Sequence, residues 1–291
     1  MPPLQRVFAY RDAGSMGPTR WYARRTYCTR SPDHTDLPGK RFVVKFCQGG
    51  TGAAAMISEV ICNELFRAGG LHVLDPAIVE ASETFAAGWN EKIATGPTEE
   101  AAKAIPEITS GRYFGTVYIP DPYQGPLTTI EAVEAPEHLV LVWVFDCLVC
   151  NIDRKVKGNL ILLPRGKKKK LRVVAADHSD CFCGSNAFSD GSWRELMQTR
   201  GRVAGHLVLE AVQSIGALGI PAAIQNARLA LGNLGAAFDQ VPGEWWAQSR
   251  IRPEQVEETL WNRLESLPNL LDMPFWNAIA NGDVTNGAQI I

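Results

Sequence analysis

The sequence predicts an α+β fold in two lobes: a small antiparallel sheet with one helix, followed by a mostly helical region. Three observations support this prediction. Runs rich in β-branched and aromatic residues concentrate in the first 46 positions, prolines punctuate residues 86–137, and the pattern beyond residue 190 is helical. We therefore expect a first lobe at residues 1–120 and a second lobe at residues 121–291.

The first lobe is expected to hold strands joined by short turns. A segment with Gly14, Ser15 and Gly17 separates the first two β-rich runs and predicts a turn. Gly69 and Gly70 are a typical end for the helix after the third run. In chain order the expected elements are strands at 6–10, 20–27 and 42–46, a helix at 53–68, a strand at 76–84, and a short strand at 112–119 within the proline-rich linker.

The second lobe begins with a segment that is apolar on all sides. Residues 139–145 are all apolar, and we expect a buried helix over 137–150, although the β-branched content also fits a strand. Two short apolar runs, at 159–163 and 171–175, flank a basic segment and predict a hairpin. Helices are then expected from about residue 190 to about residue 278.

The charge balance and hydropathy exclude several classes of protein. The chain has 291 residues, with 29 Lys+Arg against 31 Asp+Glu and a formal net charge of −2. This balance gives no global attraction to nucleic acid or to an anionic membrane, so we do not expect direct nucleic-acid binding. The sequence lacks an apolar run of about 18 residues and the pattern of a signal peptide. We expect a cytoplasmic protein without membrane contacts.

Seven cysteines leave two interpretations open. Their odd number and the missing secretory pattern argue against a disulfide framework. Cys147 and Cys150 have the CxxC spacing, with Cys181 and Cys183 downstream, so a zinc site is one interpretation. The first pair lies in the apolar segment and the second has the wrong spacing for a zinc knuckle. Buried reduced thiols are therefore favoured.

Polar residues with metal-ligand chemistry surround the predicted hairpin. If its turn is centred on residue 167, Asn159 lies opposite Ala175, and Asp177 falls two residues further on the same face. Asp153 reaches the same end from the preceding helix. An amide oxygen and two carboxylates suit Mg²⁺, which takes its remaining oxygens from phosphates and water. The alternative is that these residues cap helices and turns.

Lys45 is the matching feature of the first lobe. It lies centrally in the β-rich run 42–46, where a lysine on the inner face of the sheet can reach the phosphates of a nucleotide. Such a lysine needs a glutamate from the following helix to hold it. The alternative is a surface lysine whose charged end reaches solvent.

The order of these features resembles the protein-kinase-like fold, and most closely the HipA-like kinases of bacteria. The order is a glycine turn, a strand lysine, a helix glutamate, an irregular linker, a buried helix, and then the Asp–Asn–Asp set. The resemblance extends over roughly residues 5–260 and is clearest at 41–76 and 139–182. Val43 to Phe46 and Ala176 to Phe182 look most like that family.

The resemblance implies a role for each candidate residue. It implies Asp153 as the catalytic base and Asn159 and Asp177 as ligands of Mg²⁺. Arg154 then steadies the catalytic loop or the leaving phosphates. The implied binding groups for ATP are Lys45 at the α- and β-phosphates, a helix glutamate beside it, and the turn with Gly14, Ser15 and Gly17, whose backbone N–H groups can approach phosphate oxygens.

The sequence departs from the family pattern near the predicted site. Six positions separate Asp153 from Asn159, where the family usually has five. Lys155 stands where related loops often carry histidine, and Asp177-His178 replaces the Asp-Phe-Gly of ordinary protein kinases. His178 is either an acid or base in the reaction or a structural hydrogen-bonding group.

Two glutamates compete as the partner of Lys45. The resemblance favours Glu59, from its distance after Lys45 and before Pro76. The helical stripe of apolar residues instead has Glu64 near its centre and Glu59 off its edge. We choose Glu59.

The sequence thus predicts a serine/threonine-type kinase that transfers the γ-phosphoryl of ATP to a protein hydroxyl, with ATP and Mg²⁺ as cofactors. Two alternatives stay open. The extra residue before Asn159 fits a nucleotide-binding pseudokinase that acts through partners. The Asn-x-Asp-Arg pattern at 151–154 also resembles phosphoinositide kinases, which fits a lipid or small-molecule acceptor.

Overall fold

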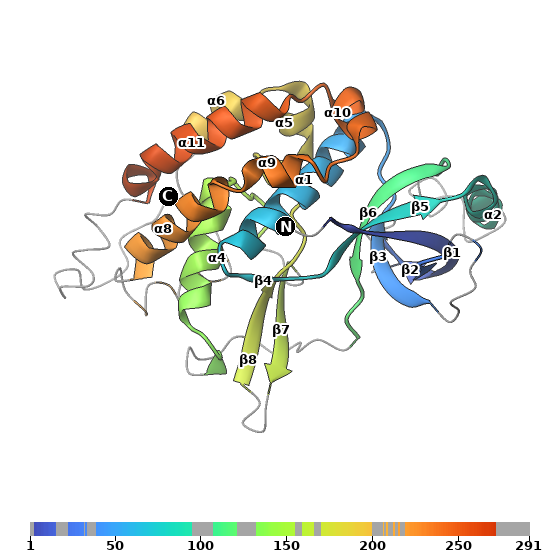
Figure 1. Ribbon diagram of the computed structural model, residues 1–291, viewed down its shortest axis with the longest axis horizontal. Helices are drawn as coiled ribbons and strands as arrows, with labels where there is room; N and C mark the ends of the chain where they lie inside the picture. The colour runs from blue at the N-terminus through green and yellow to red at the C-terminus, as the bar shows by residue number, and fades with distance from the viewer. Residues whose placement is uncertain are drawn as a thin grey trace.

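The structure is a computed structural model. It describes residues 3–15, 23–31, 33, 39–94, 107–120, 132–154, 159–165, 170–199, 206, 208, 212, 215 and 219–271. Within these ranges a β-barrel lies on one side of the molecule and a body of helices on the other (Figure 1). A separate three-stranded sheet lies beneath the helices in this view. The predicted α+β class is confirmed.

Five strands form the barrel, with the bounds Gln5–Ser15 (β1), Ala23–Thr29 (β2), Lys40–Lys45 (β3), Pro76–Ala81 (β5) and Gly111–Val117 (β6). The barrel closes in the order β1-β2-β3-β6-β5. Four of its pairings are antiparallel, but β1 and β5 run parallel. A closed barrel with one parallel pair therefore replaces the small antiparallel sheet that we expected, because β1 pairs with a strand about 70 residues away that no local pattern indicates.

Strand β1 continues further than predicted. It reaches Ser15, which pairs with Arg24 after a register shift beyond Asp12. Gly14 and Ser15 therefore lie in a strand and not in the predicted turn. Gly17 lies outside the described residues.

A helix at Glu83–Ala94 (α2) was missed by the sequence analysis, which treated residues from about 86 onward as irregular. Ser82 caps this helix, since its Oγ accepts a hydrogen bond of 3.1 Å from the backbone N–H of Phe85. Trp89 packs against Phe46, with 5.0 Å between the ring centroids. The helix thus covers the end of the barrel next to Lys45.

The predicted buried helix is present at Glu137–Leu148 (α4), and every residue from Leu139 to Leu148 is buried. Strands Leu160–Arg165 (β7) and Lys170–Ala175 (β8) form the predicted hairpin, and His72–Val73 (β4) completes the sheet in the order β4-β8-β7. The predicted register is wrong by one residue. Leu160, not Asn159, lies opposite Ala175. The hairpin is centred between residues 167 and 168, half a position beyond the predicted centre at residue 167.

The helical body confirms the helical pattern expected beyond residue 190 as far as Leu270; the expected continuation to residue 278 lies outside the described residues. Its helices are Ser185–Asp190 (α5), Trp193–Thr199 (α6), Ile220–Leu231 (α8), Leu234–Phe238 (α9), Gly243–Ser249 (α10) and Pro253–Leu270 (α11). No helix in the part of the chain that the structure describes is long and apolar enough to span a membrane.

The helix Gly49–Ala68 (α1) lies inside this body. It packs against α5, α8, α9 and α10, and Figure 1 shows it crossing beneath α9 and α10. All of its residues from Gly52 to Phe66 are buried, so it has no solvent face. A helix from the first 120 residues thus packs among helices from the last 110. The division into two lobes at residue 120 stays a prediction.

Candidate active site

Lys45 stands at the centre of the candidate site. It is the last residue of β3, and its side chain is buried. Its Nζ forms one ion pair with Glu59 of α1 and another, 2.5 Å long, with Oδ1 of Asp177. Asp177 follows β8, so three distant segments meet at one ammonium group.

These two carboxylates determine the charge state of Lys45. Burial by itself lowers the pKa of an ammonium group, but the attraction of Asp177 and Glu59 outweighs it and raises the pKa of Lys45 above its usual value. Lys45 is therefore charged at neutral pH. Burial raises the pKa of Glu59, but the ion pair with Lys45 opposes this shift and favours the carboxylate. One positive charge shared by two carboxylates favours binding of a further cation.

The ion pair forms with Glu59, as the resemblance implied. Glu64 instead accepts a hydrogen bond of 3.1 Å from Arg67, one turn along α1. The argument from the apolar stripe was wrong because it requires a helix with one buried face. Since α1 is covered on all sides, Glu59 and Glu64 are both buried, and the position of the stripe does not distinguish them.

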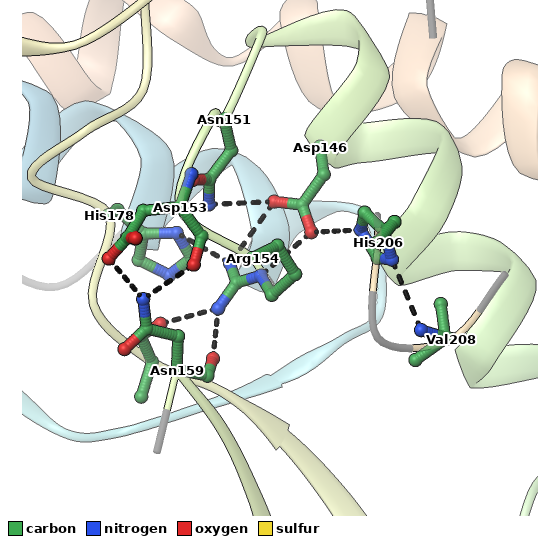
Figure 2. A network of polar contacts seen from close by, with 9 residues as sticks. Asp146, Asn151, Asp153, Arg154, Asn159, His178, His206 and Val208 are labelled. Atoms are coloured by element: carbon green, nitrogen blue, oxygen red, sulfur yellow. Dashed lines mark hydrogen bonds and ion pairs between the residues drawn. The ribbon is translucent and has the colours of Figure 1, made fainter. Parts of the chain in front are cut away.

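The loop between α4 and β7 brings Asp153 and Asn159 together. Asn159 Nδ2 lies 2.8 Å from Oδ2 of Asp153 and 3.0 Å from its backbone oxygen (Figure 2). The extra residue between them therefore does not separate the two side chains. Lys155 lies outside the described residues.

The side chain of Arg154, next to Asp153, is fully buried. Its Nη1 donates to the backbone oxygens of Asn159 and Ala176, at the end of the β7–β8 hairpin. Its Nε and Nη2 bind the carboxylate of Asp146 at 2.7 and 3.1 Å. Of the two roles expected for Arg154, these contacts support steadying the loop, since a buried guanidinium with these partners does not face a phosphate.

Asp177 and His178 connect β8 to α1. Asp177 has a left-handed backbone (φ 56°), which aspartate tolerates better than most residues. Its Oδ1 also accepts a hydrogen bond of 2.8 Å from Ser179, and the backbone oxygen of His178 accepts one of 2.6 Å from Ser58 of α1.

Burial and the nearby Arg154 lower the pKa of His178 to about 3. A buried neutral imidazole supports the structural role and not the acid–base role.

The donor set suits Mg²⁺. Asn159 directs its amide nitrogen to Asp153, so its amide oxygen faces the other way, and Asp177 supplies carboxylate oxygens. Asp180 lies close by, and burial together with Asp177 raises the pKa of its carboxyl group. Such oxygen donors in a negative environment are typical of a hard divalent cation. Asn159 and Asp177 are the residues that would hold it.

The cysteines have no such arrangement. All seven are free thiols. Cys150 contacts Cys183, with 3.2 Å between the sulfur atoms, whereas Cys181 contacts Cys62. Within the described ranges no three His, Cys, Asp or Glu side chains gather as a metal site. Six of the seven are buried, which agrees with the buried thiols that we expected.

The structure unites some predicted site residues and leaves others untested. Lys45, Glu59, Asp153, Asn159 and Asp177 lie around one region. The nucleotide-binding role implied for Gly14, Ser15 and Gly17 stays a prediction. No role was predicted for Asp146, Asn151 or His206, although they hold the loop in place. Asn151 belongs to the Asn-x-Asp-Arg pattern and Asp146 lies just before it, so the sequence marks both positions, whereas His206 has no local signal.

Similarity to known proteins identifies the family of this chain. A family model described as HipA-like kinase matches residues 34–279. The chain belongs to the HipA-like kinase family, which confirms the predicted resemblance. No curated protein matches the sequence.

A solved structure supports the fold. The chain is similar to the Helicobacter pylori proinflammatory kinase CtkA, with 11% identity, a TM-score of 0.50, and coverage of 97% of this chain and 98% of that chain. At this identity the likeness concerns the fold alone.

Proposed function

We propose that this protein is an ATP-dependent kinase that transfers the γ-phosphoryl group to a serine or threonine hydroxyl of a protein. The single observation that carries the proposal is the meeting of Lys45, Glu59 and Asp177 beside the pair formed by Asp153 and Asn159. Membership in the HipA-like kinase family supports a kinase-type activity.

Each group has a distinct task in this proposal. Lys45, held by Glu59, binds the α- and β-phosphates, while Asp153 orients the acceptor hydroxyl and accepts its proton. Asn159 and Asp177 would hold Mg²⁺, which when bound neutralises charge on the phosphates. Positioning and electrostatics therefore supply most of the rate acceleration.

The contact between Asp153 and Asn159 favours the enzyme over a pseudokinase. The pseudokinase alternative depended on the extra residue between these two positions, yet Asn159 still reaches the Asp153 carboxylate.

The test uses the purified full chain with radiolabelled ATP and Mg²⁺. We expect label to pass to the protein itself or to an added protein acceptor, and Asp153→Asn to lower this transfer by about 10²- to 10⁴-fold. We also expect Mg²⁺ and ATP together to raise the melting temperature, since a ligand at 100 times its Kd stabilises the folded state by about 2.7 kcal/mol. A folded protein that neither transfers label nor gains stability contradicts the proposal.

A further inference from the structure

The buried carboxylate of Asp146, which was not predicted as a site residue, connects several parts of the candidate active site. Asp146 lies in the last turn of α4, fully buried, and Figure 2 shows it between Asn151, Arg154 and His206. Its Oδ1 accepts hydrogen bonds from Asn151 (3.0 Å) and Arg154 (3.1 Å). Its Oδ2 accepts from Arg154 (2.7 Å) and contacts His206 Nε2 at 2.8 Å. Four donors thus saturate the two oxygens of one carboxylate.

Every N–H group of the Arg154 guanidinium likewise has a partner. Two of its five N–H groups bind Asp146, and two bind the backbone oxygens of Asn159 and Ala176. The fifth faces Nδ1 of His178, 3.4 Å away. A buried charge pair is stable only when its remaining polar atoms are satisfied, and here each one has a partner.

The partners of this pair are the backbone groups next to the proposed reacting residues. Asn151 accepts a hydrogen bond of 3.1 Å from the N–H of Asp153. Arg154 binds the carbonyl of Asn159 itself and the carbonyl of Ala176, the residue before Asp177. Through these hydrogen bonds, a shift of Asp146 would move Asn151 and Arg154, and with them the backbone of the proposed base and of both proposed metal ligands.

His206 completes the network from a distant part of the chain. The backbone N–H of Val208 donates to His206 Nδ1 (3.3 Å), so Nδ1 is an acceptor and Nε2 carries the proton that faces Asp146. His206 is 5% exposed and lies 60 positions after Asp146. Among the described residues, its Nε2–H is the one donor to Asp146 that comes from outside residues 146–154.

We infer that Asp146 and His206 are positioning residues for phosphoryl transfer, acting through Asn151 and Arg154 on Asp153, Asn159 and Asp177. The inference rests on the proposed kinase function. It predicts that removal of the His206 donor changes the rate of transfer more than it changes ATP binding, because the reacting groups shift while the nucleotide contact of Lys45 stays.

The test compares His206→Leu, which removes the donor, with His206→Gln, whose amide nitrogen can replace Nε2. Val7→Ala, in the barrel core, serves as a destabilised control without contact to the network. For each purified full-length variant, kcat and KM for Mg·ATP turnover and the melting temperature are measured. We expect His206→Leu to lower kcat by about 10- to 100-fold, with a smaller rise in KM for Mg·ATP, since the variant keeps Lys45 and both proposed Mg²⁺ ligands. His206→Gln should restore most of the rate, and Val7→Ala should lose melting temperature but not kcat.

A second variant keeps the inference open to refutation if His206→Leu does not fold. Asn151→Ala removes another donor to Asp146 and the acceptor of the Asp153 N–H, and should lower kcat in the same way. Unchanged kcat in a folded His206→Leu or Asn151→Ala protein overturns the inference, as does an equal loss of kcat in Val7→Ala. Wild-type protein without Mg·ATP binding or turnover refutes the proposed function itself, and the positioning role with it.

Discussion

Lys45 and Asp177 form an ion pair of 2.5 Å although 132 positions separate them in the chain. The pair joins the end of a barrel strand to the residue that follows the β7–β8 hairpin. Glu59 shares the same ammonium group; Lys45 and Glu59 are buried, whereas Asp177 is partly exposed. This relationship underlies the predictions for the binding of ATP and Mg²⁺.

Lys45→Met should remove both phosphoryl transfer and much of the stability. The substitution leaves the buried Glu59 and the partly exposed Asp177 without their cation. Loss of one partner of a buried ion pair costs about 3–5 kcal/mol, and Glu59 is the partner to which this cost applies. Urea unfolding at neutral pH measures the free energy of unfolding, and label transfer measures activity. Wild-type stability in this variant would show that the three groups are not coupled as described.

Glu59→Gln should reduce transfer strongly, because the amide no longer holds the Lys45 ammonium by charge. Glu64→Gln is the matched control: it lies on the same helix, is equally buried, and contacts Arg67 instead. The comparison is made by transfer rates at saturating Mg·ATP. If Glu64→Gln abolishes activity while Glu59→Gln remains near wild type, the assignment of Glu59 is wrong.

Glu64→Gln should also change how stability depends on pH. Burial raises the pKa of Glu64, with Arg67 opposing the shift. A carboxyl group whose pKa is higher in the folded state costs stability as pH rises above its unfolded value of about 4.3. The variant does not ionise, so its stability relative to wild type should increase from pH 4 to pH 7. Urea midpoints across this range that run in parallel for the two proteins would disprove the effect.

Arg154→Lys distinguishes a structural role from a phosphate-binding role. Lysine keeps the charge but has three donors in place of five, and it lacks the planar fork that binds Asp146. We expect a large loss in the free energy of unfolding, on the order of 3 kcal/mol or more. If the variant instead keeps its stability and only raises KM for ATP, Arg154 contacts phosphates and not the loop.

The sequence predicted those parts of the site that follow from local order. Lys45 in a β-rich run, the buried helix α4 and the hairpin all follow from pattern and length. Helix α2 was missed although Ser82 is a recognisable cap, because the apolar residues before it extended the predicted strand.

Other features depend on contacts between distant segments. The parallel pairing of β1 with β5 closes the barrel, and no turn signal marks it. The choice between Glu59 and Glu64 depended on helices beyond residue 180 that cover α1. His206 meets Asp146 only in the folded chain, so a single sequence gives no sign of it.

The most direct test of the proposed mechanism compares Asp153→Asn with Asp177→Asn. Asparagine keeps the size of each side chain and an oxygen that accepts the hydrogen bond from Asn159 or Ser179. Affinity for Mg·ATP is measured by calorimetry, and phosphoryl transfer by radiolabel. Asp153→Asn should lower transfer by about 10²- to 10⁴-fold and leave Mg·ATP affinity nearly unchanged. Asp177→Asn should weaken Mg·ATP binding as well as transfer. Equal loss of Mg·ATP affinity in both variants, or undiminished transfer in Asp153→Asn, would contradict the roles proposed for these two carboxylates.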